Sequence, residues 1–155
     1  MRAEAIGKRV VVGIDGSPAS YAALRWAARY ARMVGAGVEA VAAYDVGGGI
    51  GWSAPAVDAA LDAEEAKSRL KAEIGDVLGP LHDVPVEEHV VRGNAVEALI
   101  TASEGAELLV VGNRGRGGFA RLLLGSVSQQ CALHAACPVV ILRAPEDSHG
   151  AAVAG

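Results

Sequence analysis

Short apolar runs alternate along the chain with longer segments in which apolar residues recur every three or four positions. The apolar runs are rich in valine and are expected to form strands covered on both faces; they span 10–14, 38–44, 86–91, 107–111 and 139–142. The longer segments predict helices at about 19–34, 57–78, 94–103 and 126–136. The pattern therefore predicts five strands that alternate with four helices.

Helix start signals support three of these helices. Ser17, with a proline directly after it, predicts the N-cap of the first helix. Asn94 predicts a second N-cap, and Ser126 with Gln129 matches the capping box that would open the last helix.

The alternation of strands and helices predicts a parallel α/β sheet with helices on both faces and right-handed crossovers. The length of 155 residues fits one domain and leaves no room for a second. In open sheets of this kind the ligand crevice lies at the carboxyl ends of the strands, where the strand order switches. We therefore expect the loops after the first and fourth strands to line the site.

Composition excludes several classes of protein. The formal net charge is −4 and the aromatic residues are two Trp, three Tyr and one Phe, which disfavours bulk nucleic-acid binding and base stacking. No stretch approaches the ~20 apolar residues of a membrane helix, and residues 1–9 lack the apolar core of a signal peptide. Cys131 and Cys137 lack zinc-site spacing and are expected to be buried free thiols. We therefore expect a cytoplasmic protein without a nucleic-acid or membrane partner.

The segment 112–128 carries the strongest chemical signal. It starts at the end of the fourth strand, is rich in glycine and ends on a helix start. Glycines let backbone N–H groups approach an anion closely, and a helix start adds a partial positive charge. Its three arginines and two serines favour a polyphosphate. The alternative is that Ser126 only caps its helix while the arginines keep the loop in solution.

Better-known phosphate and catalytic motifs are missing. The turn after the first strand reads Gly-Ile-Asp-Gly-Ser from Gly13 onward, which is not the dinucleotide pattern GxGxxG. The segment 112–128 holds no lysine, so a Walker-type nucleotide site is excluded, and no GxSxG elbow occurs. We predict no catalytic residue and no metal ligand.

The spacing of Gly112, Gly115, Gly125 and Ser126 is G-x2-G-x9-G-[S/T], and with it the chain resembles the ATP-binding branch of the universal stress protein family. The resemblance covers about 8–143, which implies one universal stress protein domain followed by a tail, 144–155, expected to be disordered. It implies a Rossmann-like, adenine nucleotide alpha-hydrolase-like fold, with five parallel strands in order 3-2-1-4-5. It also implies a homodimer formed through the last strand, Val139–Leu142.

The resemblance further implies a role for each matching residue. Gly13 and Asp15 would lie beside the adenine or the ribose, and the backbone of Ala43 would contact the adenine edge; Asp15 also fits a plain turn-capping role. The residues that would bracket the ribose and first phosphates are Val111, Gly112, Arg114 and Gly115. The residues that would hold the β- and γ-phosphates are Gly125, Ser126, Val127 and Ser128. The remaining loop residues assigned to the site are Asn113, Arg116, Gly117 and Gly118.

The sequence favours a regulatory ATP-binding dimer that acts in a stress response. A Mg²⁺ or Mn²⁺ ion is expected to bind through the phosphates, because the loop supplies few carboxylates. One alternative is a slow ATPase or phosphotransferase in which Arg114 or Arg116 stabilises the transferring phosphate. Others are a site that prefers cAMP and an interaction module that binds no nucleotide.

Overall fold

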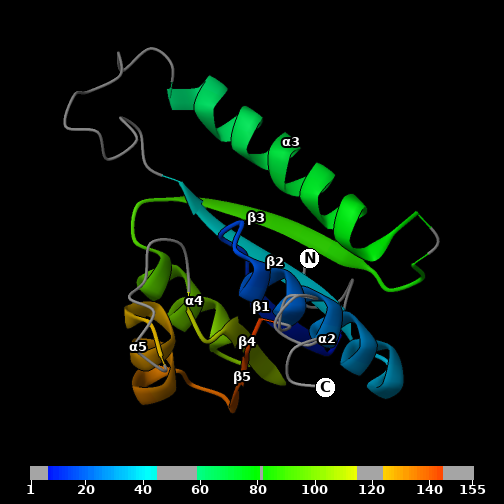
Figure 1. Cartoon of the computed structure of the whole chain (residues 1–155), viewed down its shortest axis with the longest axis vertical. Helices are drawn as coiled ribbons and strands as arrows, with labels where there is room; N and C mark the ends of the chain where they lie inside the picture. The colour runs from blue at the N-terminus through cyan, green and yellow to red at the C-terminus, as the bar shows by residue number, and fades with distance from the viewer. Residues whose placement is uncertain (1–6, 45–58, 81, 115–123, 145–155) are drawn as a thin grey trace, which may run out of the picture.

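The computed structural model describes residues 7–44, 59–80, 82–114 and 124–144, and for residues 59–62 only the backbone. The elements follow one another as β1 (Arg9–Gly13), α2 (Pro18–Val34), β2 (Gly37–Tyr44), α3 (Ala59–Leu78), β3 (Val86–Arg92), α4 (Ala95–Ser103), β4 (Leu108–Gly112), α5 (Ser126–His134) and β5 (Val139–Leu142) (Figure 1). The expected tail beyond residue 144 and the predicted helix start at 57–58 lie outside the described residues.

The five strands form one parallel sheet in the order β3-β2-β1-β4-β5. Val10 of β1 is paired with Val38 of β2 on one side and with Leu108 of β4 on the other, so β1 is the central strand. The parallel sheet predicted from the alternation is confirmed, and so is the strand order that the resemblance implied. The order switches between β1 and β4, and the carboxyl ends of these two strands lie side by side.

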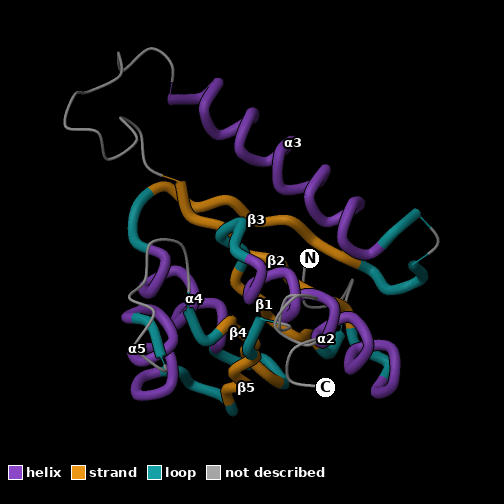
Figure 2. Tube along the Cα trace, viewed as in Figure 1, coloured by secondary structure: helices purple, strands orange, loops and turns teal. Residues whose placement is uncertain are grey.

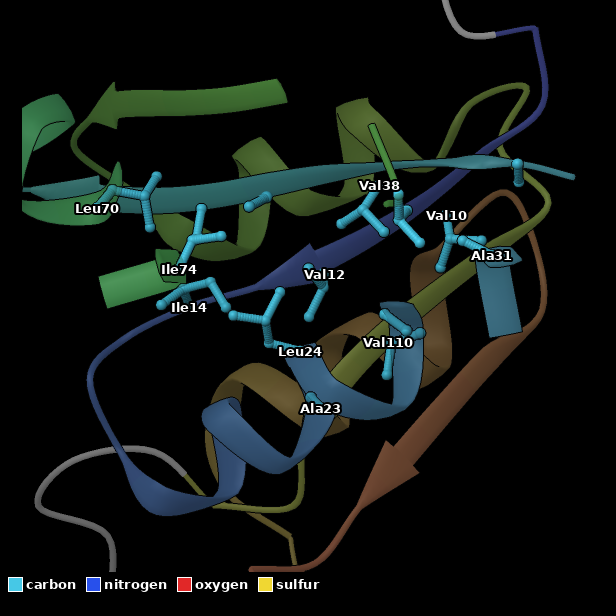
Figure 3. Close-up of a cluster of buried hydrophobic side chains, with 14 residues drawn as sticks. Val10, Val12, Ile14, Ala23, Leu24, Ala31, Val38, Leu70, Ile74 and Val110 are labelled. Atoms are coloured by element: carbon cyan, nitrogen blue, oxygen red, sulfur yellow. The ribbon is translucent and has the colours of Figure 1, made fainter. Parts of the chain in front are cut away.

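Helices α2 and α3 cover one face of the sheet, and α4 and α5 cover the other (Figures 1 and 2). Because side chains alternate along a strand, β1 sends Val10 and Val12 to the α2 side and Val11 to the α4 side. Figure 3 shows the α2-side core, where Leu24 packs beside Val12. Burial of these apolar side chains fixes the faces on which the strand-end loops emerge.

Two of the three predicted helix caps are confirmed. The Ser17 hydroxyl accepts a hydrogen bond from the backbone N–H of Ser20 at 3.1 Å. The Asn94 side-chain oxygen accepts from the backbone N–H groups of Val96 at 2.8 Å and Glu97 at 3.3 Å. Each cap pairs backbone donors that the first turn of a helix leaves without an intrahelical partner.

The predicted capping box at Ser126 is wrong. The N-cap of α5 is Gly125, and Ser126 is already the first helical residue. The backbone N–H of Gly125 donates to the carbonyl of Asn113 at 2.6 Å, which anchors the chain one residue before the expected cap. The Gln129 side chain therefore donates to the carbonyl of Leu124 at 3.0 Å, outside the helix. The helix also ends at His134, earlier than the predicted residue 136.

The cysteines are both free, as predicted, but differ in burial. Cys131 is buried in the α4-side core, and burial raises the pKa of its thiol. Cys137 is half-buried; burial raises the pKa of this thiol too, and the nearby Arg9 guanidinium partly opposes the rise. No helix in the described part of the chain is long and apolar enough to cross a membrane.

Replacing Gly75 with alanine should stabilise the protein. Gly75 lies inside α3, is exposed, and an added Cβ would have no atom within 4 Å. Alanine restricts the unfolded chain more than glycine does, so the free energy of unfolding should rise by about 0.5–1 kcal/mol. Denaturant unfolding of both proteins measures the change. Gly79→Ala, at a glycine with φ of 84°, is the matched control and should destabilise.

Candidate functional site

One end of the candidate site is a cavity of about 270 Å³ at the carboxyl ends of β1 and β2. Asp15 comes from the turn after β1, and Ala43 and Tyr44 come from the last residues of β2. Helix α3 closes the cavity with Arg69 and Glu73. Two of the predicted site residues, Asp15 and Ala43, therefore line the same cavity.

Asp15 also shapes its own turn. Its carboxylate Oδ1 accepts a hydrogen bond from the backbone N–H of Ser17 at 2.9 Å, and its backbone N–H donates to the Ser20 hydroxyl at 3.3 Å. Gly16 follows with φ of 84°, a left-handed conformation that favours glycine. The turn-capping role weighed for Asp15 is therefore present, and it fixes this carboxylate at the edge of the cavity.

Three residues of the cavity wall were missed by the sequence analysis. Tyr21 of α2 donates a hydrogen bond from its hydroxyl to the Glu73 carboxylate of α3, and Arg69 lies one helical turn before Glu73. Tyr21 and Glu73 are 52 positions apart, so no local spacing pattern reveals the pair. The contact ties α2 to α3 at the cavity.

The other end of the site is formed where β4 meets α5. The carbonyl of Asn113, just after β4, accepts from the backbone N–H of Gly125 at 2.6 Å and lies 3.0 Å from the hydroxyl of Ser128. The N–H of Asn113 itself donates to the carbonyl of Leu142 at the end of β5, at 2.7 Å. These bonds hold the start of α5 against the end of β4. The first-turn N–H groups of a helix have no intrahelical acceptor, so this end is positive and suits an anion.

Ser126 and Ser128 differ in what their hydroxyls can offer. Ser126 is exposed at the first position of α5. Ser128 is 2% exposed, and its hydroxyl lies 3.0 Å from each of the carbonyls of Asn113 and Gly125. Because a hydroxyl has a single hydrogen to donate, that of Ser128 is used to hold the loop ends together.

Packing requires glycine at position 112 and is tight at Gly13. A Cβ on Gly112 would lie 2.6 Å from the Cβ and 2.8 Å from the carbonyl carbon of Ala19, so the end of β4 touches the first turn of α2. A Cβ on Gly13 would lie 3.1 Å from a methyl group of Leu99. Packing against α2 therefore explains why position 112 is a glycine, independently of any ligand that the motif binds.

The fold brings most of the predicted residues to one edge of the sheet. Gly13 ends β1 and Asp15 lies in the turn after it, and Ala43 is the next-to-last residue of β2. Val111 and Gly112 end β4, with Asn113 and Arg114 directly after it. Gly125 caps α5, and Ser126 to Ser128 form its start. Val111 is buried, and its side chain packs in the α4-side core. The predicted loop residues Gly115, Arg116, Gly117 and Gly118 lie outside the described residues. Among the described residues, no group of three or more His, Cys, Asp or Glu side chains could hold a metal ion.

The family model and the curated relatives that match this chain all belong to one family. The model of the "Universal stress protein family" matches residues 7–143. A universal stress protein of Mycolicibacterium smegmatis is 35% identical over 147 residues, which are 90% of this chain and 49% of that protein. A universal stress protein of Mycobacterium tuberculosis is 37% identical over 141 residues, which are 86% of this chain and 45% of that protein. The chain spans about half the length of these curated relatives.

Solved structures agree with the fold and hold nucleotides in two cases. Universal stress protein UspA of Lactobacillus plantarum superposes with a TM-score of 0.69 at 22% identity, over 88% of this chain and 97% of its own. A universal stress protein in complex with cAMP has a TM-score of 0.65 and 30% identity, covering 89% and 98%. One of Archaeoglobus fulgidus in complex with dAMP has a TM-score of 0.59 and 25% identity, covering 87% and 97%. The sheet has the adenine nucleotide alpha-hydrolase-like arrangement of these neighbours.

Proposed function

The chain belongs to the universal stress protein family, and on that premise we propose that it is a regulatory, ATP-binding protein of a stress response in the cytoplasm. The nucleotide would lie across the carboxyl ends of β2, β1 and β4. The observation that carries the proposal is the contact between Gly125 and Asn113, which sets the positive start of α5 beside the end of β4.

The base and ribose would occupy the cavity beside β1 and β2. The late backbone of β2 at Ala43 would offer hydrogen bonds to the adenine edge, and Gly13 at the end of β1 would lie beside the base or the ribose. Asp15, held by its turn, would accept a hydrogen bond from a ribose hydroxyl or the base. Val111, Gly112 and Arg114 would bracket the ribose and the first phosphates.

The β- and γ-phosphates would lie on the first turn of α5. Backbone N–H groups of Ser126, Val127 and Ser128 and the exposed Ser126 hydroxyl would bind them, with Gly125 allowing close approach. The loop between, with Asn113, Gly115, Arg116, Gly117 and Gly118, would complete the enclosure. A Mg²⁺ or Mn²⁺ ion held by phosphate oxygens would neutralise part of their charge.

Relatives that bind adenine nucleotides support the choice of ligand class. The cAMP complex and the dAMP complex are of proteins at 30% and 25% identity to this chain. The cationic loop favours the more highly charged triphosphate over cAMP. The segment 112–128 contains no Asp, Glu or His to orient an attacking water, so we propose binding rather than turnover.

Arg114→Ala should separate ATP from nucleotides with fewer phosphates. Loss of a cation beside the phosphates should weaken the affinity for ATP about tenfold or more, because hydrogen bonds between charged groups are stronger than those between neutral groups. AMP and cAMP should be affected less. Calorimetric titration of each nucleotide measures this, with Arg25→Ala on the exposed face of α2 as the matched control. An equal loss for ATP and AMP would contradict the placement of the phosphates.

We also propose a homodimer through β5. The strand Val139–Leu142 is at the sheet edge, and each of its apolar residues is half-buried within one copy of the chain. A second copy would cover them and pair the open edge. Light scattering of the purified protein should give twice the chain mass at micromolar concentration. If the protein has the mass of a monomer at this concentration and still binds nucleotide, the dimer proposal is contradicted and the nucleotide site is not.

A further inference from the structure

A cavity of about 400 Å³ lies on the opposite face of the sheet, between α4 and the strands β2 and β3. Val41 and Val91 of the strands and Ala98 and Ala102 of α4 give it apolar walls. The two alanines are four positions apart, so they stand on one face of α4, and their short side chains leave the space open. Its volume is in the range of small-molecule sites.

One wall of this cavity is charged and ordered. Glu39, only 2% exposed, has Oε1 3.0 Å from Nη1 of Arg9 and Oε2 3.3 Å from Nε2 of His89. The same His89 Nε2 lies 3.0 Å from Oε1 of Glu87. Glu39 and His89 both line the cavity, and His89 is 36% exposed. Buried charges are costly to keep unless they are paired, as they are here.

The contacts of His89 require a proton on its Nε2 atom. Ionised carboxylates accept hydrogen bonds and cannot donate them. With the carboxylates of Glu39 and Glu87 both facing Nε2, that nitrogen carries a proton and donates it to them. The acceptors that line the cavity are the carboxylate oxygens of Glu39 and Glu97, and they match a ligand that donates hydrogen bonds.

The charges around the cavity point the same way. The charged groups in or next to the cavity wall are three carboxylates, those of Glu39, Glu87 and Glu97, and two guanidinium groups, those of Arg9 and Arg92. The carboxylates therefore outnumber the guanidinium groups by one. Such a field favours a cation and disfavours an anion.

We propose that this cavity is a second ligand site, independent of the nucleotide site, for a small organic ammonium ion with an apolar body. The apolar part would rest between Val41, Val91 and Ala98, and the ammonium group would donate to the Glu39 carboxylate beside His89. The site differs from the nucleotide site in both face and charge, since that site is built around arginines and a helix start. It stands whether or not ATP binds.

The first test uses three ligands of one shape on the native protein. Benzylamine, benzyl alcohol and benzoate are each titrated into ¹⁵N-labelled protein, with and without saturating ATP. Benzylamine should shift the amide signals of the cavity residues and the imidazole nitrogen signals of His89 saturably, and ATP should leave its affinity unchanged. No shift at millimolar benzylamine overturns the site, and equal binding of benzoate overturns the cation preference.

Variants test the position of the ligand. Ala98→Leu fills the cavity and should weaken benzylamine by about tenfold or more, while Ala95→Leu, at a helical alanine outside the cavity, should not. Glu87→Gln removes the charge of the second carboxylate that faces His89 and should weaken benzylamine roughly fivefold, while Glu88→Gln, on the other face of β3, should not. Unchanged affinity in Glu87→Gln together with silent His89 signals overturns the proposal even if Ala98→Leu does not fold.

Discussion

Arg9→Met should lower the free energy of unfolding by about 3–5 kcal/mol, because it leaves the buried Glu39 carboxylate without its guanidinium. Arg9 is 12% exposed and bridges three elements: β1, from which it comes, Glu39 on β2, and the end of α4. It donates to the carbonyls of Ala102 and Glu104 as well as to Glu39. Urea unfolding, followed by circular dichroism, measures the loss.

A second substitution shows whether the loss comes from the unpaired charge. Replacing both partners, Arg9→Met with Glu39→Met, should recover a large part of it, because apolar pairs commonly match buried ion pairs in stability. Arg25→Met on the exposed face of α2 should change stability by less than about 0.5 kcal/mol. If the single Arg9 variant were as stable as the parent protein, the ion pair would not anchor β1 to β2 and α4.

Gly112→Ala should destabilise the protein by about 3 kcal/mol, at the upper end of the usual cost of overpacking. The new Cβ would lie 2.8 Å from the carbonyl carbon of Ala19, which is backbone and cannot move aside as a side chain does. The end of β4 would have to shift, and the start of α5 with it through the Asn113 carbonyl. We expect ATP affinity to fall with stability, measured by thermal unfolding and calorimetry.

Gly13→Ala is the matched control on the neighbouring strand. Its new Cβ would lie 3.1 Å from a methyl group at the flexible end of Leu99, so a small rotation relieves the contact. We expect a loss of no more than about 1 kcal/mol. Equal losses at Gly13 and Gly112 would mean that the contact between β4 and α2 is no tighter than ordinary core packing.

The sequence predicted the elements well because their signals are local. Short apolar runs and helical patterns placed all five strands and four helices, and the Ser17 and Asn94 caps act within three residues of themselves. The prediction failed at α5, where the deciding partner is the carbonyl of Asn113, twelve positions before Gly125. A capping-box pattern holds no information about such a partner.

The candidate site was predictable in part, for the same reason. The glycine-rich segment at the end of β4 and Asp15 after β1 could be assigned to one site, because a parallel sheet brings the carboxyl ends of its strands to the same edge. The pair Tyr21–Glu73 and the network of Arg9, Glu39 and His89 join positions 30 or more apart. They depend on strand register and helix packing, which no local spacing encodes.

The most direct test of the nucleotide site is a titration of ATP with Mg²⁺ into ¹⁵N-labelled protein, with each backbone amide assigned. The account predicts saturable shifts concentrated at Asp15, Ala43, Gly112 to Arg114 and Gly125 to Ser128, with the α4 cavity unaffected. Shifts confined to other surfaces, or none at millimolar ATP, would contradict it.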